Sequence, residues 1–431
     1  MNVAIIGYGI EGKSAAEYWK RLGDNITICD ENERLEVPAY AEKRLGPGYL
    51  KNLHDFDLIV RSAGINPEVI AAGNPGIKNK ITTVVNEFLR VCPTRNVIGI
   101  TGTKGKGTTS TLTAKMLEEA GKQVFLGGNI GNSPLDFLPH LTAESWVVLE
   151  LSSFQLYDIK FSPHIAVCLM VEPEHLNWHS GMDDYLNAKS NLFAHQTAND
   201  VAIYFAKNLN SHRVASASPG AKLCYFAPPG AYVDDGNIMI DNQKLCSVDD
   251  LKLIGAHNWQ NACAAATAVW QVTQDVDALR RALNTFSGLE HRIEFVREFK
   301  GVKYYDDSFG TVPSAAMVAI EAFEEPKVLI LGGSNKGVPF DGLAKAITKY
   351  NVAQVVVIGE TAPLIETALK NVGYHNITHG GEKMPDIVKT ATELARPGDI
   401  VLLSPACASF GLFHNYKERG DLFKQAVRAL V

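Results

Sequence analysis

A glycine-rich stretch at residues 99–109 has the residue types that hold the phosphates of a nucleotide. The apolar run at 96–100 predicts a strand before it, and residues 110–120 predict a helix after it. Glycines let backbone N–H groups turn inward, and the N-terminus of a helix adds partial positive charge. The order of strand, turn and helix therefore indicates a phosphate-binding loop.

Lys106 stands in this stretch where its charge can neutralise the outer phosphates of a nucleotide. The next residue is Gly107, where the strict motif has Ser or Thr, so Thr108 must supply the hydroxyl that holds Mg²⁺. The competing interpretation is a flexible glycine-rich loop without a ligand. The positions of Lys106 and Thr108 favour phosphate chemistry.

Carboxylates and histidines follow two further apolar runs. Glu150 closes a strand predicted at 146–151, and a carboxylate at that end of a strand suits Mg²⁺. An N-cap or a surface acid is the alternative. His175 follows the run at 165–170 and can ligate a metal as a neutral imidazole. We expect the nearby His179 to be exposed and without a role.

Lys189 lies on a helix predicted around residues 185–189, where a single lysine is usually part of a solvated face. Asn258 and Asn261 begin an Ala-rich helix at 259–271 and lie on one face of it. Their amides offer both a donor and an acceptor, which suits an adenine edge, although Asn258 could equally cap the helix.

Strands alternate with helices along the whole chain, which favours parallel sheets with right-handed crossovers. At the N-terminus a strand leads into Gly7-x-Gly9-x-x-Gly12 and a second strand ends at Asp30. Residues 218–250 indicate hairpins. In the C-terminal third, the segments 305–308, 332–337 and 404–410 carry polar residues and lie at the ends of strand-like runs. Open α/β sheets bind ligands at such strand ends.

The bulk composition is that of a multidomain globular protein of 431 residues, with 46% hydrophobic and 20% charged residues. The net charge of −6 argues against nucleic acid or an anionic membrane as the main partner. Seven cysteines without a CxxC pair suit a reducing cytoplasm. The first residues predict a strand rather than a signal peptide, and no apolar run is long enough to span a membrane.

Taken together, these motifs resemble the Mur ligases over all 431 residues. The motifs that carry the resemblance are Gly102-Thr-Lys-Gly-Lys106, Gly127-Gly-Asn129-Ile-Gly131, Glu150-Leu-Ser-Ser-Phe-Gln155, Gly255-Ala-His257-Asn258 with Asn261, Leu289-Glu-His-Arg292, Asp307-Ser308 and Leu403-Ser-Pro-Ala-Cys-Ala-Ser409. The last motif, with Arg419 and Gly420 downstream, is most similar to the glutamate-adding branch of the family.

The resemblance implies an α/β fold of three domains. It implies a Rossmann-like UDP-sugar domain at 1–93, a P-loop ATPase-like domain with a mostly parallel sheet at 94–297, and a Rossmann-like amino-acid domain at 298–431. Because nucleotide and amino acid lie on different blocks, we expect a hinge near 296–300.

It further implies a cytoplasmic step of peptidoglycan precursor synthesis by a monomer. ATP phosphorylates the carboxylate of UDP-N-acetylmuramoyl-L-alanine, and the amine of D-glutamate attacks the acyl phosphate and expels phosphate. Such chemistry needs positioning and charge neutralisation more than a protein nucleophile. The sequence shows no Ser-His-Asp order and no activated cysteine, which agrees.

The resemblance also assigns roles to single residues. Lys106 would hold the β- and γ-phosphates, Thr108 and Glu150 one Mg²⁺, and His175 would lie by a second Mg²⁺. Lys189 matches the family lysine whose carbamylation converts a cation into a metal-bridging carboxylate. Around the nucleotide the resemblance places Gly102, Thr103, Lys104, Gly105, Gly107, Asn258, Asn261, Arg292 and Asp307. Around the UDP-sugar it places Gly9, Ile10, Gly64 and Asn129, and around the amino acid Thr311, Lys336, Ser409, Phe410 and Tyr416.

Five positions depart from the family pattern. Phe309 replaces a lysine that would lie near the carboxylate of the amino acid, Tyr416 stands where Phe is usual, and Asn32 replaces a basic residue. Lys104 and Gly107 make the phosphate loop similar to that of folylpolyglutamate synthase. We therefore expect weaker binding of an acidic amino acid than in relatives, unless Arg419 or a nearby lysine compensates.

Three other functions account for parts of the sequence. The Gly7-x-Gly9-x-x-Gly12 turn with Asp30 alone would suit a nicotinamide-dependent dehydrogenase, which leaves the second phosphate loop unexplained. A folylpolyglutamate synthase or a Mur ligase for another acidic amino acid shares the chemistry. A nucleotide-binding scaffold without activity is the third alternative, and the intact set of Lys106, Glu150, His175, Lys189 and Arg292 argues against it.

Overall fold

The computed structural model describes residues 1–253, 255–335 and 337–431. Contacts divide the chain into two compact units. The first comprises residues 1–251 and 256–286, and the second comprises the described residues of 252–255 and 287–431. The chain thus passes between the units at 251–252, at 255–256 and, for the last time, at 286–287. The expected hinge at 296–300 is wrong, because residues 294–299 form a strand that pairs with the next one. The boundaries of three domains stay predictions.

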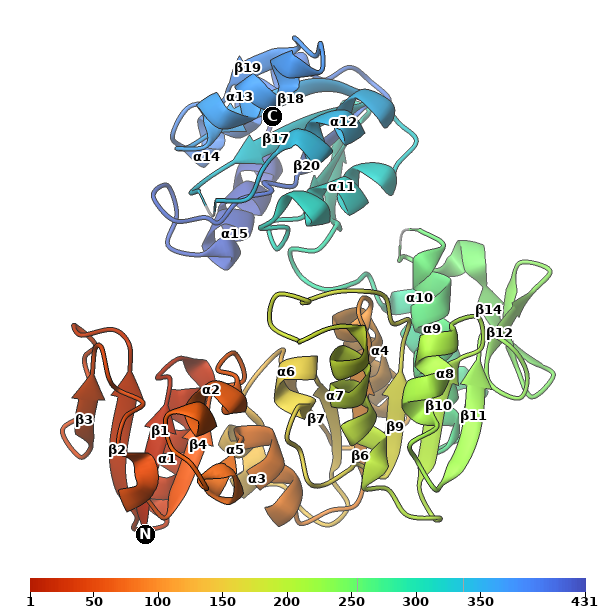
Figure 1. Ribbon diagram of the computed structural model, residues 1–431. Helices are drawn as coiled ribbons and strands as arrows, with labels where there is room; N and C mark the ends of the chain where they lie inside the picture. The colour runs from red at the N-terminus through yellow and green to blue at the C-terminus, as the bar shows by residue number, and fades with distance from the viewer. Residues whose placement is uncertain (254, 336) are drawn as a thin grey trace. The chain divides into compact units, whose positions relative to one another are not determined.

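The N-terminal part of the first unit is a parallel sheet in the order β3-β2-β1-β4-β5 (Figure 1). Its buried central strand β1 comes from the apolar run predicted at residues 3–6. The strands are β1 (Asn2–Ile6), β2 (Asn25–Asp30), β3 (Glu42–Leu45), β4 (Leu58–Arg61) and β5 (Ile81–Thr82). The helices are α1 (Ile10–Arg21), α2 (Pro67–Ala72) and α3 (Val84–Val91).

The rest of the first unit is built on six parallel strands in the order β11-β10-β9-β6-β8-β7. The strands are β6 (Val97–Thr101), β7 (Val124–Gly128), β8 (Trp146–Glu150), β9 (Ile165–Cys168), β10 (Val201–Phe205) and β11 (Ala221–Tyr225). The helices are α4 (Lys106–Glu119), α5 (Pro134–Phe137), α6 (Ser153–Leu156), α7 (Met182–Ala194), α8 (Leu209–Ala215), α9 (His257–Trp270) and α10 (Val276–Thr285).

The hairpins predicted within 218–250 are present at β12 (Tyr232–Asp234), β13 (Asn237–Ile240) and β14 (Gln243–Ser247), which form an antiparallel sheet. Residues 221–225 of that segment instead add the parallel edge strand β11.

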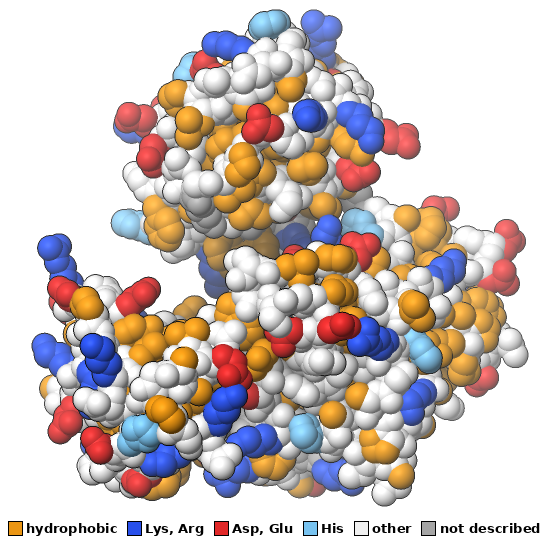
Figure 2. Space-filling view, viewed as in Figure 1, with side chains coloured by type: hydrophobic (Ala, Val, Ile, Leu, Met, Phe, Trp, Pro, Cys, Tyr) orange, Lys and Arg blue, Asp and Glu red, His pale blue; other side chains and the backbone are white. Residues whose placement is uncertain are grey.

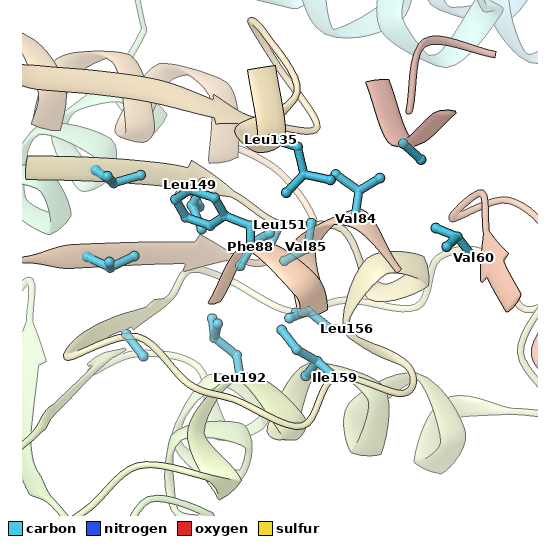
Figure 3. Packing of buried hydrophobic residues seen from close by; sticks show 14 of the residues in the cluster. Val60, Val84, Val85, Phe88, Leu135, Leu149, Leu151, Leu156, Ile159 and Leu192 are labelled. Carbon is cyan, nitrogen blue, oxygen red and sulfur yellow. The ribbon is translucent and has the colours of Figure 1, made fainter. Parts of the chain in front are cut away.

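One hydrophobic core joins the two parallel sheets of the first unit. Figure 3 shows Val84, Val85 and Phe88 of α3 packed beside Leu135 of α5 and Leu149 of β8. The ring of Phe88 also meets that of Phe137, with centroids 5.7 Å apart. Because these side chains are buried together, the N-terminal sheet and the phosphate-loop sheet share one apolar interior.

The second unit is a six-stranded sheet in the order β15-β16-β20-β17-β18-β19, parallel except for the β15–β16 hairpin. Separate apolar clusters cover it. The strands are β15 (Glu294–Phe299), β16 (Val302–Asp306), β17 (Lys327–Gly332), β18 (Val352–Ile358), β19 (Ile377–His379) and β20 (Ile400–Leu403). The helices are α11 (Pro313–Glu321), α12 (Asp341–Lys349), α13 (Ala362–Asn371), α14 (Met384–Leu394) and α15 (Tyr416–Arg428).

The predicted α/β fold class is confirmed. On the face drawn in Figure 2, basic and acidic side chains are interspersed, which agrees with the small net charge. Across the described ranges, no helix is both long and apolar enough to cross a membrane.

Candidate active site

The phosphate loop lies between β6 and α4, as predicted, and two of its glycines are required by geometry. Gly102 has a φ of 149° and Gly105 a φ of 86°, conformations that side chains disfavour. A Cβ at Gly102 would lie 2.6 Å from the Cβ of Leu169, and one at Gly105 would overlap Oδ1 of Asn261. The loop is therefore close-packed on both sides.

Lys106 is the first residue of α4, where the N–H groups of the helix start are unpaired by the helix itself. Its Nζ donates to the carbonyl oxygens of Gly102, at 3.2 Å, and Thr103, at 3.0 Å. Thr108 is buried in the first turn, and Lys104 is exposed. The ammonium thus lies over the loop that it is predicted to serve.

Three neighbouring strands, β9, β6 and β8, end at the same edge of the parallel sheet. The ends of these strands lead to the loop of His175, to the phosphate loop, and to Glu150. Lys189 approaches the same edge from α7, since its Nζ donates to the carbonyl oxygen of Gly102. The structure therefore brings Lys106, Glu150 and Lys189, which lie far apart in sequence, to one place.

The carboxylate of Glu150 fits a divalent cation. Its Oε1 accepts a hydrogen bond from Nδ2 of Asn129 at 2.9 Å. Its Oε2 is buried and has no hydrogen-bond partner among the described residues. A buried carboxylate oxygen is costly unless a cation or donor meets it, and Mg²⁺ prefers such oxygens.

His175 is an exposed residue in a left-handed conformation, with a φ of 56°. Its ring lies 4.7 Å from that of Phe154, and its Nε2 is 3.6 Å from a carboxylate oxygen of Glu174. Partial burial lowers the pKa of His175, and the charges of Lys106 and Lys189 lower it further, against the opposing carboxylate of Glu174. The neutral imidazole that results is the form able to ligate a metal.

The ammonium of Lys189 is buried, so the alternative of a solvated helix face does not apply: the residue is 1% exposed. Its Nζ donates to the carbonyl oxygen of Gly102 at 2.9 Å and to Oγ1 of Thr101 at 3.4 Å. It also lies 4.5 Å from the ring centroid of Tyr185. Burial, and then the charge of Lys106, lowers the pKa of Lys189 to about 7.

His179 differs from the expectation for it. Its side chain is buried, with Nε2 3.0 Å from Oγ of Ser153 and Nδ1 3.3 Å from Oδ2 of Asp184. The sequence showed no Ser-His-Asp order, yet the fold places these three side chains in one hydrogen-bonded row. Ser153 and His179 are 26 residues apart, so no local pattern indicates their contact.

Of the four residues predicted to line the UDP-sugar, Gly9, Ile10 and Gly64 lie at two loops, after β1 and after β4, and Asn129 follows β7. Ile10 is 80% exposed beside Gly9, and the carbonyl oxygen of Gly64 accepts a hydrogen bond from Nε1 of Trp178 at 2.9 Å. Asp30, the acid of the dinucleotide-like pattern, accepts from the backbone N–H of Tyr8 at 2.8 Å. The carboxylate of Asp30 thus holds the backbone of the glycine turn in place.

Sequence reasoning missed Glu11 and Gln155 at this place. Oε1 of Glu11 accepts from Nε2 of Gln155 at 2.7 Å, and its Oε2 accepts from the backbone N–H of Ala63 at 3.1 Å. The two predicted sugar loops are therefore tied to α6, which follows Glu150. The presence of Glu11 inside the glycine turn was the available signal.

Asn258 and Asn261 lie in the first turns of α9, which packs on α4. Nδ2 of Asn261 donates to Oδ1 of Asn258 at 2.9 Å, and Oγ1 of Thr109 donates to Oδ1 of Asn261 at 3.3 Å. The predicted face of two amides is thus present against the phosphate loop. Contact with adenine stays a prediction.

In the second unit, Arg292 lies 5.8 Å from the ring centroid of Phe309, and Phe309 meets the ring of Tyr416 edge-on at 5.2 Å. Phe410 is exposed and Ser409 is buried. Phe309 follows β16, and Ser409 and Phe410 follow β20, as expected, whereas Arg292 precedes β15. Thr311 follows the same strand as Phe309, and Lys336 lies outside the described residues.

Asp307 and Arg419 are both buried in this unit. Oδ2 of Asp307 accepts from Oγ of Ser404 at 2.6 Å, and burial raises the pKa of Asp307 to about 7. The guanidinium of Arg419 donates to Oγ and O of Ser308 and to O of Cys407. These bonds tie Arg419 to the loops of Ser308 and Cys407, and its expected compensation for the missing lysine stays a prediction.

Comparisons with known proteins show which family the chain belongs to. The family description "Mur ligase middle domain" matches residues 100–269, and "Mur ligase, glutamate ligase domain" matches residues 291–407. The chain belongs to the Mur ligase family. Membership makes it an ATP-dependent ligase, and the dehydrogenase interpretation is wrong.

Curated relatives match the chain along its whole length. Proteins named UDP-N-acetylmuramoylalanine--D-glutamate ligase from Symbiobacterium thermophilum and Acetivibrio thermocellus are 38% and 36% identical to it. Both alignments cover 100% of this chain and 98% and 96% of those proteins.

Solved structures show the same fold at lower identity. UDP-N-acetylmuramate-alanine ligase MurC from Thermotoga maritima matches with a TM-score of 0.60 at 18% identity, covering 100% of this chain and 99% of that one. MurF ligase from the same organism, in complex with ADP, matches with a TM-score of 0.58 at 18% identity, covering 99% and 94%.

Proposed function

We propose that this Mur ligase adds D-glutamate to UDP-N-acetylmuramoyl-L-alanine through an acyl phosphate, with ATP as the phosphoryl donor. The names of relatives that share its full length support the two substrates. The observation that carries the chemistry is the convergence of Lys106, Glu150 and Lys189 at three neighbouring strand ends. The reaction belongs to peptidoglycan precursor synthesis, and we propose a cytoplasmic, monomeric enzyme.

In this proposal Lys106 neutralises the β- and γ-phosphates, because its ammonium already lies over the loop. Thr108 and Glu150 hold one Mg²⁺, and His175 lies by a second. When bound, Mg²⁺ neutralises charge on the transferring phosphoryl group. The remaining nucleotide contacts are assigned to Asn258, Asn261, Arg292 and Asp307.

Lys189 acts in this proposal as a carbamate. A neutral amine attacks CO₂, a C–N bond forms, and one proton is released, which leaves a carboxylate on nitrogen. The lowered pKa of Lys189 supplies the neutral amine near pH 7. A free ammonium would repel Mg²⁺, whereas the carbamate attracts it.

The substrate residues stay as the resemblance assigns them. Gly9, Ile10, Gly64 and Asn129 line the UDP-sugar. The amino acid is assigned to Thr311, Lys336, Ser409, Phe410 and Tyr416. Because Phe309 lacks the family's cation, we expect a higher KM for glutamate than in relatives with lysine there.

Phosphate release from ATP tests the function directly. The purified chain is mixed with ATP, UDP-N-acetylmuramoyl-L-alanine and one amino acid at a time. The amino acids are the D- and L-forms of glutamate, aspartate and alanine. We expect release with D-glutamate that needs all three substrates. Preference for a neutral amino acid would contradict the substrate assignment, and folate-stimulated ADP release without the UDP-sugar would favour a folylpolyglutamate synthase.

A further inference from the structure

A row of buried side chains connects three segments of the first unit. Ser153 begins α6, His179 precedes α7, and Asp184 lies in the first turn of α7. Nε2 of His179 is 3.0 Å from Oγ of Ser153, and its Nδ1 is 3.3 Å from Oδ2 of Asp184. The imidazole therefore bridges the start of one helix and the start of the next, and Figure 1 shows α6 and α7 as neighbours.

The partners fix the tautomer of His179. A carboxylate only accepts hydrogen bonds, so Nδ1 carries the proton and donates to Asp184. Nε2 then accepts from the hydroxyl of Ser153. The rings of Trp178 and Tyr185 pack against the imidazole at 4.7 and 5.2 Å. Burial lowers the pKa of His179 against the opposing effect of Asp184, which keeps this neutral form in place.

The row has the order of a hydrolytic triad but cannot act as one. Ser153 is 2% exposed, and the side chain of His179 has no exposed surface. A nucleophilic serine must reach a substrate carbonyl in a position that also meets oxyanion donors. A hydroxyl enclosed in this way can only hold structure.

Both ends of this row of side chains are connected to the candidate active site. Ser153 lies three residues after Glu150, at the start of α6. On the other side, Tyr185 comes directly after Asp184, and its hydroxyl lies 3.0 Å from Oγ1 of Thr103 in the phosphate loop. The ring of the same tyrosine supports Nζ of Lys189 at 4.5 Å.

We propose that His179 is a positioning residue that fixes α7 against the Glu150 loop and thereby places Lys189 beside the phosphate loop. The proposal rests on the proposed function, because it gives Lys189 its importance. A displacement of about 1 Å at a reacting group can cost about a hundredfold in rate, so loss of the bridge should lower kcat. The KM for ATP should change little, because the imidazole makes no hydrogen bond to the phosphate loop itself.

Three variants separate the two hydrogen bonds. His179→Asn keeps a donor near the position of Nδ1, His179→Gln keeps a polar group near Nε2, and His179→Phe keeps only the ring. We expect kcat of His179→Phe to be about tenfold or more below that of the wild type. The kcat of His179→Asn and of His179→Gln should be about threefold above that of His179→Phe. The KM for ATP should stay within about threefold.

Hydrogen–deuterium exchange gives a readout independent of activity. Amides of residues 182–189 should exchange faster in His179→Phe than in the wild type, by about tenfold, because the start of α7 loses its tie to α6. The matched control is His195→Phe, since His195 ends the same helix and bonds the carbonyl oxygen of Ile159 at 3.0 Å, away from the site. The control should leave kcat and exchange at 182–189 unchanged.

Two results would overturn the positioning role: unchanged exchange at 182–189 in all three variants, or a kcat of His179→Phe within about twofold of the wild type. A wild type without substrate-dependent phosphate release would instead contradict the proposed function. The exchange data would still decide whether His179 holds α7. If His179→Phe does not fold, the Asn and Gln variants carry both measurements.

Discussion

The buried ammonium of Lys189 should make the enzyme less stable than a variant without it. Burial and the charge of Lys106 lower the pKa of Lys189 from 10.5 to about 7. We therefore expect Lys189→Met, which fills a similar volume without a charge, to resist urea better near neutral pH while losing activity. A stabilised but inactive variant is typical of a residue kept for function.

The magnitude follows from the pKa. One pH unit is worth about 1.36 kcal/mol, so holding the charged form in the folded state costs about 5 kcal/mol. Methionine gives up the hydrogen bonds to Gly102 and Thr101, a loss of about 1.5 kcal/mol. Near pH 7, where the folded lysine is half neutral, Lys189→Met should be more stable by about 3 kcal/mol.

The pH dependence gives the sign of the effect. The unfolded lysine keeps its proton up to a pKa near 10.5, whereas the folded one loses it above about 7. Between these values the unfolded state binds more protons, so the stability of the wild type rises with pH. The difference in free energy of unfolding between Lys189→Met and the wild type should therefore decrease as the pH rises, and it should vanish by about pH 9–10.

Urea unfolding of both proteins at a series of pH values, in CO₂-free buffer, measures this difference. The CO₂-free condition is needed because a carbamate would replace the amine. Groups common to both proteins cancel in the comparison. A variant that is less stable than the wild type at every pH, or a difference that does not change with pH, would refute the reasoning.

Three further predictions concern single residues. Lys106→Ala should fold normally but lose about a hundredfold in kcat, near 3 kcal/mol of barrier; near-native phosphate release from a folded variant would contradict its assignment. Lys189→Ala should have low activity that acetate partly restores, and full activity without acetate would rule out a metal-bridging carbamate. Asp158→Ala should lower the free energy of unfolding by about 3 kcal/mol, because Nε of Arg61, a buried side chain, bonds its Oδ2 at 3.0 Å; an unchanged urea midpoint would count against that ion pair.

The sequence predicted the strands that carry the site because they are buried on both faces. The strands β6, β8 and β9 appear as apolar runs with polar residues at their ends, which is the pattern of a central parallel strand. The edge strand β3, with the sequence Glu-Lys-Arg-Leu, has no such run and was missed. Its strand pairing depends on β2, which a local pattern does not show.

Site residues could be predicted from the sequence where a single segment determines their position. Lys106 and Glu150 follow directly from strand ends. The burial of Lys189 depends on Gly102, 87 residues away, and the environment of His179 depends on Ser153. Asp307 shows the same limit: the sequence placed it at a strand end, but its hydrogen bond from Ser404, 97 residues away, appears only in the fold. Hydrogen bonds between distant segments decide such cases, and sequence spacing does not encode them.

The common interior of the two sheets in the first unit limits how this enzyme can be recombined with its relatives. Exchanging residues 1–93 for those of another family member, to change the sugar nucleotide that is bound, would place foreign side chains against Phe137 and Leu135. Such a chimera would need a matched surface on α3 and α5 as well as a matched substrate loop. Engineering of this protein should therefore keep residues 1–251 and 256–286 together as a single module, and recombination breakpoints belong near 286–287, after the last residue of that module.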